Sequence, residues 1–240
     1  MNLSARRIGA IVRKELREYR RNRSIVSGMA ILPLVFSIQP LIAVLRFSTS
    51  ASGALSHEHT LLYMLGIPTL VPAFVAAYAV AGERQQGTLE PALTTPIRRE
   101  EFLLGKAIAA LIPSLVLAYA VFALFALAVV LFAQPNVASA VFQGADLLVQ
   151  VVFTPLLAVW TIWVALAIST RASDVRVAQQ LAMLASLPPV LLTVLIALDV
   201  IAPTVQLGLG LGLLLLILDG LGWRVTAHLF DRERLLTSPS

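Results

Sequence analysis

Histidines are the side chains in this sequence best suited to bind a metal or to move protons, and two of the three lie close together. His57, Glu58 and His59 follow one another, and the third histidine is His228. Their composition suits zinc, but the spacing His-Glu-x-x-His, which places two histidines on one face of a helix, is absent. Cysteine is absent as well, which excludes disulfides, thiol catalysis and cysteine-bound metals. We therefore interpret His57–His59 as a polar loop and expect no metal site.

Glycine-rich segments can cradle phosphates, and this chain has one run of the form Gly-x-Gly-x-Gly at Gly208, Gly210 and Gly212. The run lies inside an apolar segment with no strand pattern before it, and no Gly-x-x-x-x-Gly-Lys-Ser/Thr loop occurs anywhere in the sequence. We expect Gly208 and Gly212 to form a face for close helix packing instead. We expect no cofactor bound to this chain.

The pair Glu100–Glu101 resembles the glutamate pair of CAAX-type intramembrane proteases. However, the arginine expected after that pair is absent, and no histidine follows within a membrane span. The sequence also lacks a Gly-x-Ser-x-Gly nucleophile elbow. An intramembrane enzyme is therefore an alternative whose catalytic residues are missing, and we expect a non-catalytic protein.

The elements that must position any functional residue are apolar. Hydrophobic residues make up 58% of the 240 residues and charged residues only 13%, against about 25% charged in soluble domains. Long apolar blocks without alternation are typical of helices that cross a bilayer, which need about 20 residues each. We predict an all-α polytopic membrane protein with six transmembrane helices over Ile25–Leu45, Leu61–Gly82, Ile108–Phe132, Leu147–Ser169, Val177–Leu198 and Val205–Trp223.

Basic residues are distributed very unevenly around these six spans. Of the 18 Lys and Arg residues, only Arg46 falls in a connection on one side, and the other seventeen fall on the opposite side. The positive-inside rule then predicts that both termini are cytoplasmic. We expect the excess of basic charge to reflect membrane orientation and contact with anionic lipid, with no nucleic-acid partner.

The segment 1–24 before the first span is predicted to be an amphipathic helix. Ser4 is suited to cap its first turn with the side-chain oxygen. Apolar residues recur at helical spacing along one face, at Ile8, Ile11, Val12, Leu16 and Tyr19. We expect this stripe to lie in the headgroup boundary of the inner membrane surface. Glu15 and Glu18, which would be unfavourable against anionic lipid, suit a docking surface for a cytoplasmic partner.

The connection between the second and third spans is polar and bounded by turn residues, and residues 83–96 of it are called the 83–96 connection below. Gly87 permits a sharp turn, and Thr88 is a good N-cap for a short helix that begins at Leu89. Glu90 lies in the first turn, where the helix dipole favours a negative charge, and Pro96 ends the helix. A helix of two turns is unstable alone, so it must pack against another surface.

These motifs resemble those of type-2 ABC exporter permeases, over nearly the whole chain. The central motif is Glu83-Arg84-Gln85-Gln86-Gly87-Thr88-Leu89-Glu90, followed by Leu93, Thr95-Pro96, Arg99-Glu100 and Gly105-Lys106. The N-terminal part is similar through Lys14-Glu15-Leu16 with Arg20-Arg21, and the fourth connection through Ser169-Thr170-Arg171 with Val175-Arg176-Val177-Ala178-Gln179-Gln180. Phe230-Asp231-Arg232-Glu233-Arg234-Leu235-Leu236 is similar to the C-terminal end of the family.

The resemblance implies a permease that forms the substrate pathway of an ATP-driven exporter in the cytoplasmic membrane of a prokaryote. Its partners would be separate ABC ATPase subunits, which would bind ATP and Mg, a second copy or a homologous permease, and the lipid bilayer. The short helix in the coupling segment 83–105 would be the coupling helix that fits a cleft of the ATPase. The residues implied in ATPase coupling are Glu83, Gly87, Thr88, Leu89, Glu90, Leu93, Pro96, Lys14, Glu15 and Arg20. The six spans would form one transmembrane domain over 25–223, followed by a cytoplasmic tail over 224–240.

An ion-gradient-driven secondary transporter is the alternative from a different class. It would need buried charges near the bilayer midplane and usually repeat symmetry, and the sequence indicates neither. Asp199 and Asp219 lie near the ends of the fifth and sixth spans, where water is close. Gln150, Thr154 and Thr161 are polar residues inside the fourth span that could line a path or bond to their own helix.

Overall fold

The computed structural model describes residues 3–46, 59–89, 97–133 and 135–229. Six helices in this part are long and apolar enough to cross a membrane, which confirms the all-α, six-span prediction. The elements are α1 (Ala5–Arg21), α2 (Arg23–Arg46), the 3₁₀ helix η2 (Thr60–Leu65), α4 (Gly66–Gln85), α6 (Arg99–Phe132), the short α7 (Pro135–Val141), α8 (Gly144–Arg171), α9 (Val175–Ala197) and α10 (Val205–Leu229).

Two spans begin differently from the prediction. The second span starts with the 3₁₀ turn of η2 and becomes an α-helix at Gly66. The third helix begins at Arg99, nine residues before the predicted start at Ile108, and therefore includes Lys106. A lysine did not end the helix because its ammonium group is paired inside the protein, as described below. The short helix predicted from Leu89 to Thr95 falls mostly on residues 90–96, outside the described residues.

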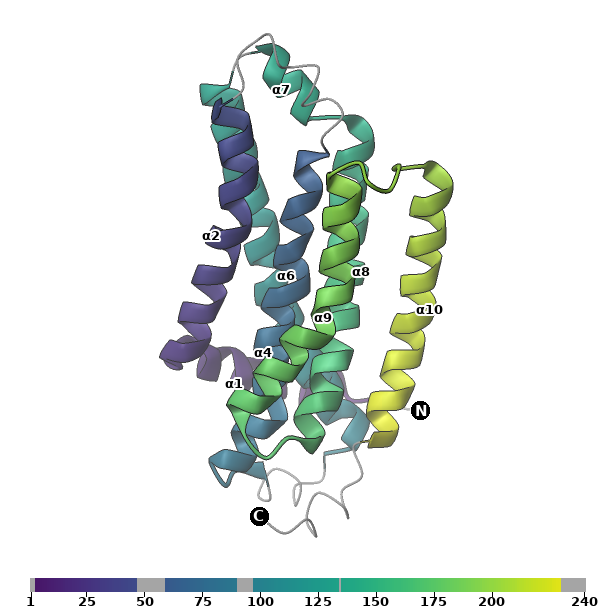
Figure 1. The fold of residues 1–240 in the computed structure, drawn as a ribbon. Coiled ribbons are helices and arrows are strands. Elements are labelled where there is room, and N and C mark those ends of the chain that lie inside the picture. Colours follow the sequence, from purple (N-terminus) through teal and green to yellow (C-terminus); the bar gives the residue numbers. More distant parts are fainter. Residues whose placement is uncertain (1–2, 47–58, 90–96, 134, 230–240) are drawn as a thin grey trace.

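The long helices run side by side between two ends of a bundle, and α1 lies across one end (Figure 1). The same end carries the end of α4, the start of α6, the turn from α8 to α9 and the end of α10, and it is called the basic end below. The opposite end carries α7 and the connection from α9 to α10. Arg46 ends α2 at this opposite end, so the described spans keep the uneven distribution of basic residues seen in the sequence.

Helix α4 is the central helix of the bundle. It is buried along 94% of its most apolar window, whereas α10 is buried along only 6%. Its most extensive contacts are with α8 and α9. Small residues allow this close approach, since Ala73, Ala76, Ala77, Ala79 and Ala81 are all buried in the core between these helices. Helix α4 therefore packs against α2, α6, α8 and α9.

Helix α10 packs against α8 through one glycine that the sequence analysis did not identify. A Cβ atom at Gly222 would lie 2.9 Å from Cβ of Trp163, so only glycine fits there. The predicted packing face of Gly208 and Gly212 is wrong within this chain. A Cβ atom at Gly208 would meet no described atom within 4 Å, and one at Gly212 would meet only Phe153, at 3.8 Å. Leu209 and Leu213 beside them are exposed, as residues facing lipid would be.

Candidate functional site

The chain turns sharply at Gly87, as the sequence predicts, directly after Gln86, the C-cap residue of α4. Gly87 has φ +66°, a left-handed conformation that glycine adopts without steric cost. The Gly87 N–H donates to the Arg84 carbonyl at 3.1 Å, and the Thr88 N–H donates to the Glu83 carbonyl at 2.9 Å. This pair of bonds is a Schellman motif. It reverses the chain and fixes where the 83–96 connection leaves the membrane domain.

A cluster of charges lies next to this turn, at Glu83, and is called the charge cluster below; it consists of the buried residues Glu15, Glu83 and Lys106 and of the half-exposed Lys14. The Lys106 side chain is fully buried, and its Nζ lies 3.0 Å from Glu15 Oε1 and 3.2 Å from Glu83 Oε1. Lys14 Nζ is hydrogen-bonded to Glu83 and lies 3.3 Å from Glu15 Oε1. The cluster therefore joins three elements, α1, α4 and α6, by ionic contacts.

The cluster can exist only because its charges pair. A lone ammonium or carboxylate buried this deeply would cost several kcal/mol. Lys106 also donates to the Ala79 carbonyl at 2.5 Å and lies 4.8 Å from the centre of the Phe102 ring. Burial alone would lower the pKa of Lys14, but the hydrogen bond to Glu83 and the charges of its carboxylate neighbours raise that pKa above its ordinary value. Lys14 therefore stays charged at any physiological pH.

Helix α1 contacts α6 at a second point, Glu101, in addition to the charge cluster. The Ser4 N–H donates to Glu101 Oε1 at 2.8 Å, and Arg7 Nη1 lies 3.4 Å from Glu101 Oε2. Between these two contacts, Ile11 lies over Gly105, where an added Cβ would be 2.6 Å from Ile11 Cγ2. The predicted side-chain cap by Ser4 is wrong, because the Ser4 side chain makes no cap hydrogen bond. The Ser4 backbone N–H instead meets a carboxylate from another helix.

The apolar face of α1 packs into the protein. Ile11 and Tyr19 are buried against the bundle, so the prediction that this stripe lies in the headgroup boundary is wrong for these two residues. Burial raises the pKa of the Tyr19 hydroxyl, and the charges of Glu15 and Glu18 raise it further. The physical reason for the difference is Gly105, which allows α1 to approach α6 closely enough to bury its own apolar side chains.

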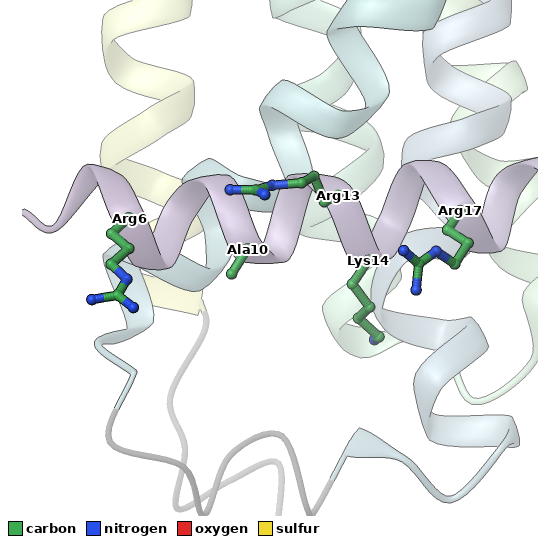
Figure 2. A pocket seen from close by; sticks show the side chains of 5 residues that line it. All are labelled: Arg6, Ala10, Arg13, Lys14 and Arg17. Atoms are coloured by element: carbon green, nitrogen blue, oxygen red, sulfur yellow. The ribbon is translucent and has the colours of Figure 1, made fainter.

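The opposite face of α1 is basic. Arg6, Ala10, Arg13, Lys14 and Arg17 line a shallow groove along it. Arg6 and Arg17 project from the side of α1 that faces away from the spans (Figure 2). Exposed guanidinium groups in a row form a surface that attracts negative charge.

The predicted coupling residues have different positions. Glu83, Lys14 and Glu15 meet in the charge cluster, with Glu15 only 1% exposed. Leu89 is buried in a small core with Val80, Phe102 and Leu103. Arg20 is exposed on the last turn of α1. Thr88 is exposed, and its hydroxyl lies 3.4 Å from the Glu83 carbonyl. Glu90, Leu93 and Pro96 lie outside the described residues.

Sequence analysis missed Lys106 and Glu101 as members of this site. A signal existed for Lys106, because it is one of only two lysines in the chain and interrupts an apolar run. Glu101 carried no comparable signal, since an acidic residue in the first turn of a helix is already explained by the helix dipole. In the structure Glu101 also accepts the Arg98 backbone N–H at 3.2 Å, which closes the start of α6.

The other polar residues singled out from the sequence lie in different environments, and the two threonines bond to their own helix. His59 Nδ1 lies 2.9 Å from Asp146 Oδ1, whereas His57 and Glu58 lie outside the described residues. The hydroxyls of Thr154 and Thr161 donate to carbonyls of their own helix, at 2.5 Å to Gln150 and 2.9 Å to Leu157. Of the two aspartates, Asp199 is exposed at the end of α9, and Asp219 Oδ1 is buried with no hydrogen-bond partner among the described residues.

The chain is similar to a known protein family over most of its length. Residues 9–209 match the sequence profile of a family described as ABC-2 family transporter protein. This range includes the charge cluster, the Gly87 turn and the first five spans. A comparison with curated proteins finds no match.

Proposed function

The chain belongs to the ABC-2 family of transporter proteins and is a multi-pass membrane permease of an ABC transporter, and from this premise we propose that it exports its substrate with energy from a separate ATPase subunit. The ATPase subunit would bind ATP and Mg. This chain would supply the substrate pathway and the surface that receives the movement of the ATPase. It would have no catalytic role of its own.

The observation that carries the proposal is the charge cluster next to the Gly87 turn. Glu83, the first residue of the 83–96 connection, is bonded to Lys14 of α1 and lies 3.2 Å from Lys106 of α6. A push on the connection would therefore move α1 and α6 together with α4. Because interiors are close-packed, such a displacement passes to neighbouring helices rather than being absorbed locally.

The basic face of α1 supports a second contact with the ATPase. It lies at the same end of the bundle as the 83–96 connection, and its groove faces away from the spans. An acidic surface on the ATPase would complement it. In this arrangement Glu15 acts inside the permease, because its carboxylate is buried against Lys106.

The membrane orientation follows from the distribution of basic residues. We place the basic end and both termini in the cytoplasm, in the inner membrane of a prokaryote. A second copy of this chain or a homologous permease would complete the pathway. The exposed leucines and valines of α2, α9 and α10 offer apolar faces for that partner and for lipid.

The proposal is tested with the double variant Glu90→Ala/Leu93→Ala in full-length protein reconstituted with its ATPase. We expect ATP hydrolysis by the ATPase to become independent of the permease, while the thermal unfolding midpoint of the permease changes little. The matched control is Arg98→Ala/Arg99→Ala, which truncates two exposed residues of the same cytoplasmic segment. Unchanged stimulation of hydrolysis in the Glu90/Leu93 variant would refute the assignment of the 83–96 connection as the coupling element.

A further inference from the structure

The two residues that follow Glu83 contact different helices from Glu83 itself. Arg84 Nη2 donates to the Thr170 carbonyl at 2.9 Å, and Arg84 Nη1 donates to the Ala172 carbonyl. These carbonyls belong to the last turn of α8 and its C-cap, where backbone acceptors have no partner within the helix. A guanidinium group at this position also complements the negative end of the helix dipole.

Gln85 continues the pattern to α9. Its Nε2 donates to Asp174 Oδ2 at 2.9 Å. The other oxygen of the same carboxylate accepts the Arg176 N–H at 2.6 Å and so caps the first turn of α9. Asp174 is thus shared between the start of α9 and the end of α4.

A third contact lies one turn deeper, inside the bundle. Ser169 of α8 is fully buried, and its hydroxyl donates to the Ala77 carbonyl at 2.6 Å. The same oxygen accepts the N–H groups of Val80 at 3.0 Å and Ala81 at 2.9 Å. In a regular α-helix the Ala81 N–H would bond to the Ala77 carbonyl. The Ser169 hydroxyl bonds to both of these groups and so inserts into the backbone hydrogen bonds of α4.

We infer that the end of α4 and the turn from α8 to α9 move as one body, and that Arg84 and Gln85 are positioning residues that pass movement of the 83–96 connection to α8 and α9. The inference rests on the proposed function and adds a second branch to it. Glu83 directs movement to α1 and α6, whereas Arg84, Gln85 and Ser169 direct it to α8 and α9. Three contacts at separate points prevent both sliding and rotation of the end of α4 against the turn from α8 to α9.

The first test concerns the contact alone and needs no ATPase. We compare amide hydrogen exchange of the full-length chain in lipid nanodiscs for wild type, Arg84→Ala and the control Arg98→Ala. Loss of the two charge-assisted bonds should speed exchange over residues 170–174 by about tenfold in Arg84→Ala, with no change in Arg98→Ala. Unchanged exchange over 170–174 in Arg84→Ala would overturn the inference.

The second test measures whether ATP-driven movement reaches the far end of α9. Because the chain contains no cysteine, a single Val200→Cys at the exposed outer turn after α9 is the only thiol of the permease. Its labelling rate by a membrane-impermeant maleimide is measured in the complex with the ATPase, without nucleotide and after trapping with ATP and vanadate. We expect the rate to differ between the two states in the Val200→Cys protein, and the difference to vanish when Arg84→Ala is added.

The outcomes separate the inference from the proposed function. If the rate does not respond to ATP even with Arg84 present, ATP-driven movement is wrong and the inference fails with it. If the rate responds equally with and without Arg84, the inference is wrong and the proposed function stands.

Two further variants exclude a purely structural explanation. Gln85→Ala removes an exposed side chain and leaves the buried core intact, so it should fold and still reduce the response. Arg84→Lys keeps the charge but lacks the planar fork of the guanidinium group, so its response should lie between those of wild type and Arg84→Ala. A normal response in Gln85→Ala would contradict the positioning role inferred for Gln85.

Discussion

Replacing Lys106 by methionine should destabilise the membrane domain more than the same replacement of Lys14, the other lysine of the charge cluster. Methionine matches the length of the lysine stem but carries no charge. The Lys106 ammonium group has no exposed surface and lies 3.0 Å from Glu15 Oε1 and 3.2 Å from Glu83 Oε1. Its removal leaves two buried carboxylates to share Lys14.

The expected loss of stability follows from the burial of the Lys106 ammonium group. Breaking a buried ion pair by removing one partner costs about 3–5 kcal/mol, because an uncompensated charge remains. The comparison variant is Lys14→Met, which removes the other lysine of the cluster. Lys14 is 52% exposed, so water screens its contacts and its removal should cost only about 1 kcal/mol.

The assay is reversible unfolding of full-length protein in mixed micelles of increasing SDS content, followed by tryptophan fluorescence. Trp163 and Trp223 lie with ring centroids 5.3 Å apart near the basic end and report on packing there. The double variant Lys106→Met/Glu15→Gln removes one charge of each sign and should be more stable than the sum of the single effects predicts, by about 1–3 kcal/mol. Equal costs for the two lysine variants, or strict additivity in the double variant, would show that Lys106 is not the buried partner of Glu15 and Glu83.

Three further predictions concern the turn and the contacts of α1 with α6. Gly87→Ala forces a side chain into a left-handed conformation at φ +66° and should cost about 1–2 kcal/mol, whereas Gly220→Ala, with open space around it, should not lower the thermal unfolding midpoint. Gly105→Ala places a methyl group 2.6 Å from Ile11 Cγ2 and should cost about 1–3 kcal/mol, with partial recovery when Ile11→Ala is added; no recovery in thermal unfolding would contradict the contact. Glu101→Ala removes the acceptor of the Ser4 N–H and should speed amide exchange in the first turn of α1. An unchanged exchange rate there would contradict the contact between Ser4 and Glu101.

The sequence predicts the spans because their cause is local. Twenty apolar residues without charge form a helix in a bilayer whatever their neighbours are, so all six spans were predicted. The Gly87 turn was predicted for the same kind of reason, since only the residue type decides which backbone conformations are open.

The contacts of the site could not be predicted in this way. Lys106 and Glu15 are 91 residues apart in sequence, and Ser169 and Ala77 are 92 apart. Helical periodicity shows that α1 has an apolar face, but not that a glycine on another helix would let that face be buried inside the protein. For this reason the sequence predicted a docking role for Glu15 and not its burial. The partner of Glu15 is Lys106, which the sequence placed before the start of the third span and which lies inside α6.

We propose that a separate ATPase drives this permease through the 83–96 connection. The most direct measurement is gentle purification of the tagged full-length protein from its native membranes, with quantitative mass spectrometry of what accompanies it. We expect a stoichiometric subunit that carries a phosphate-binding loop, and we expect it to be lost from the Glu90→Ala/Leu93→Ala variant. Absence of any ATPase, under conditions that keep other membrane complexes whole, would contradict the proposed ATP-driven export and favour transport driven by an ion gradient.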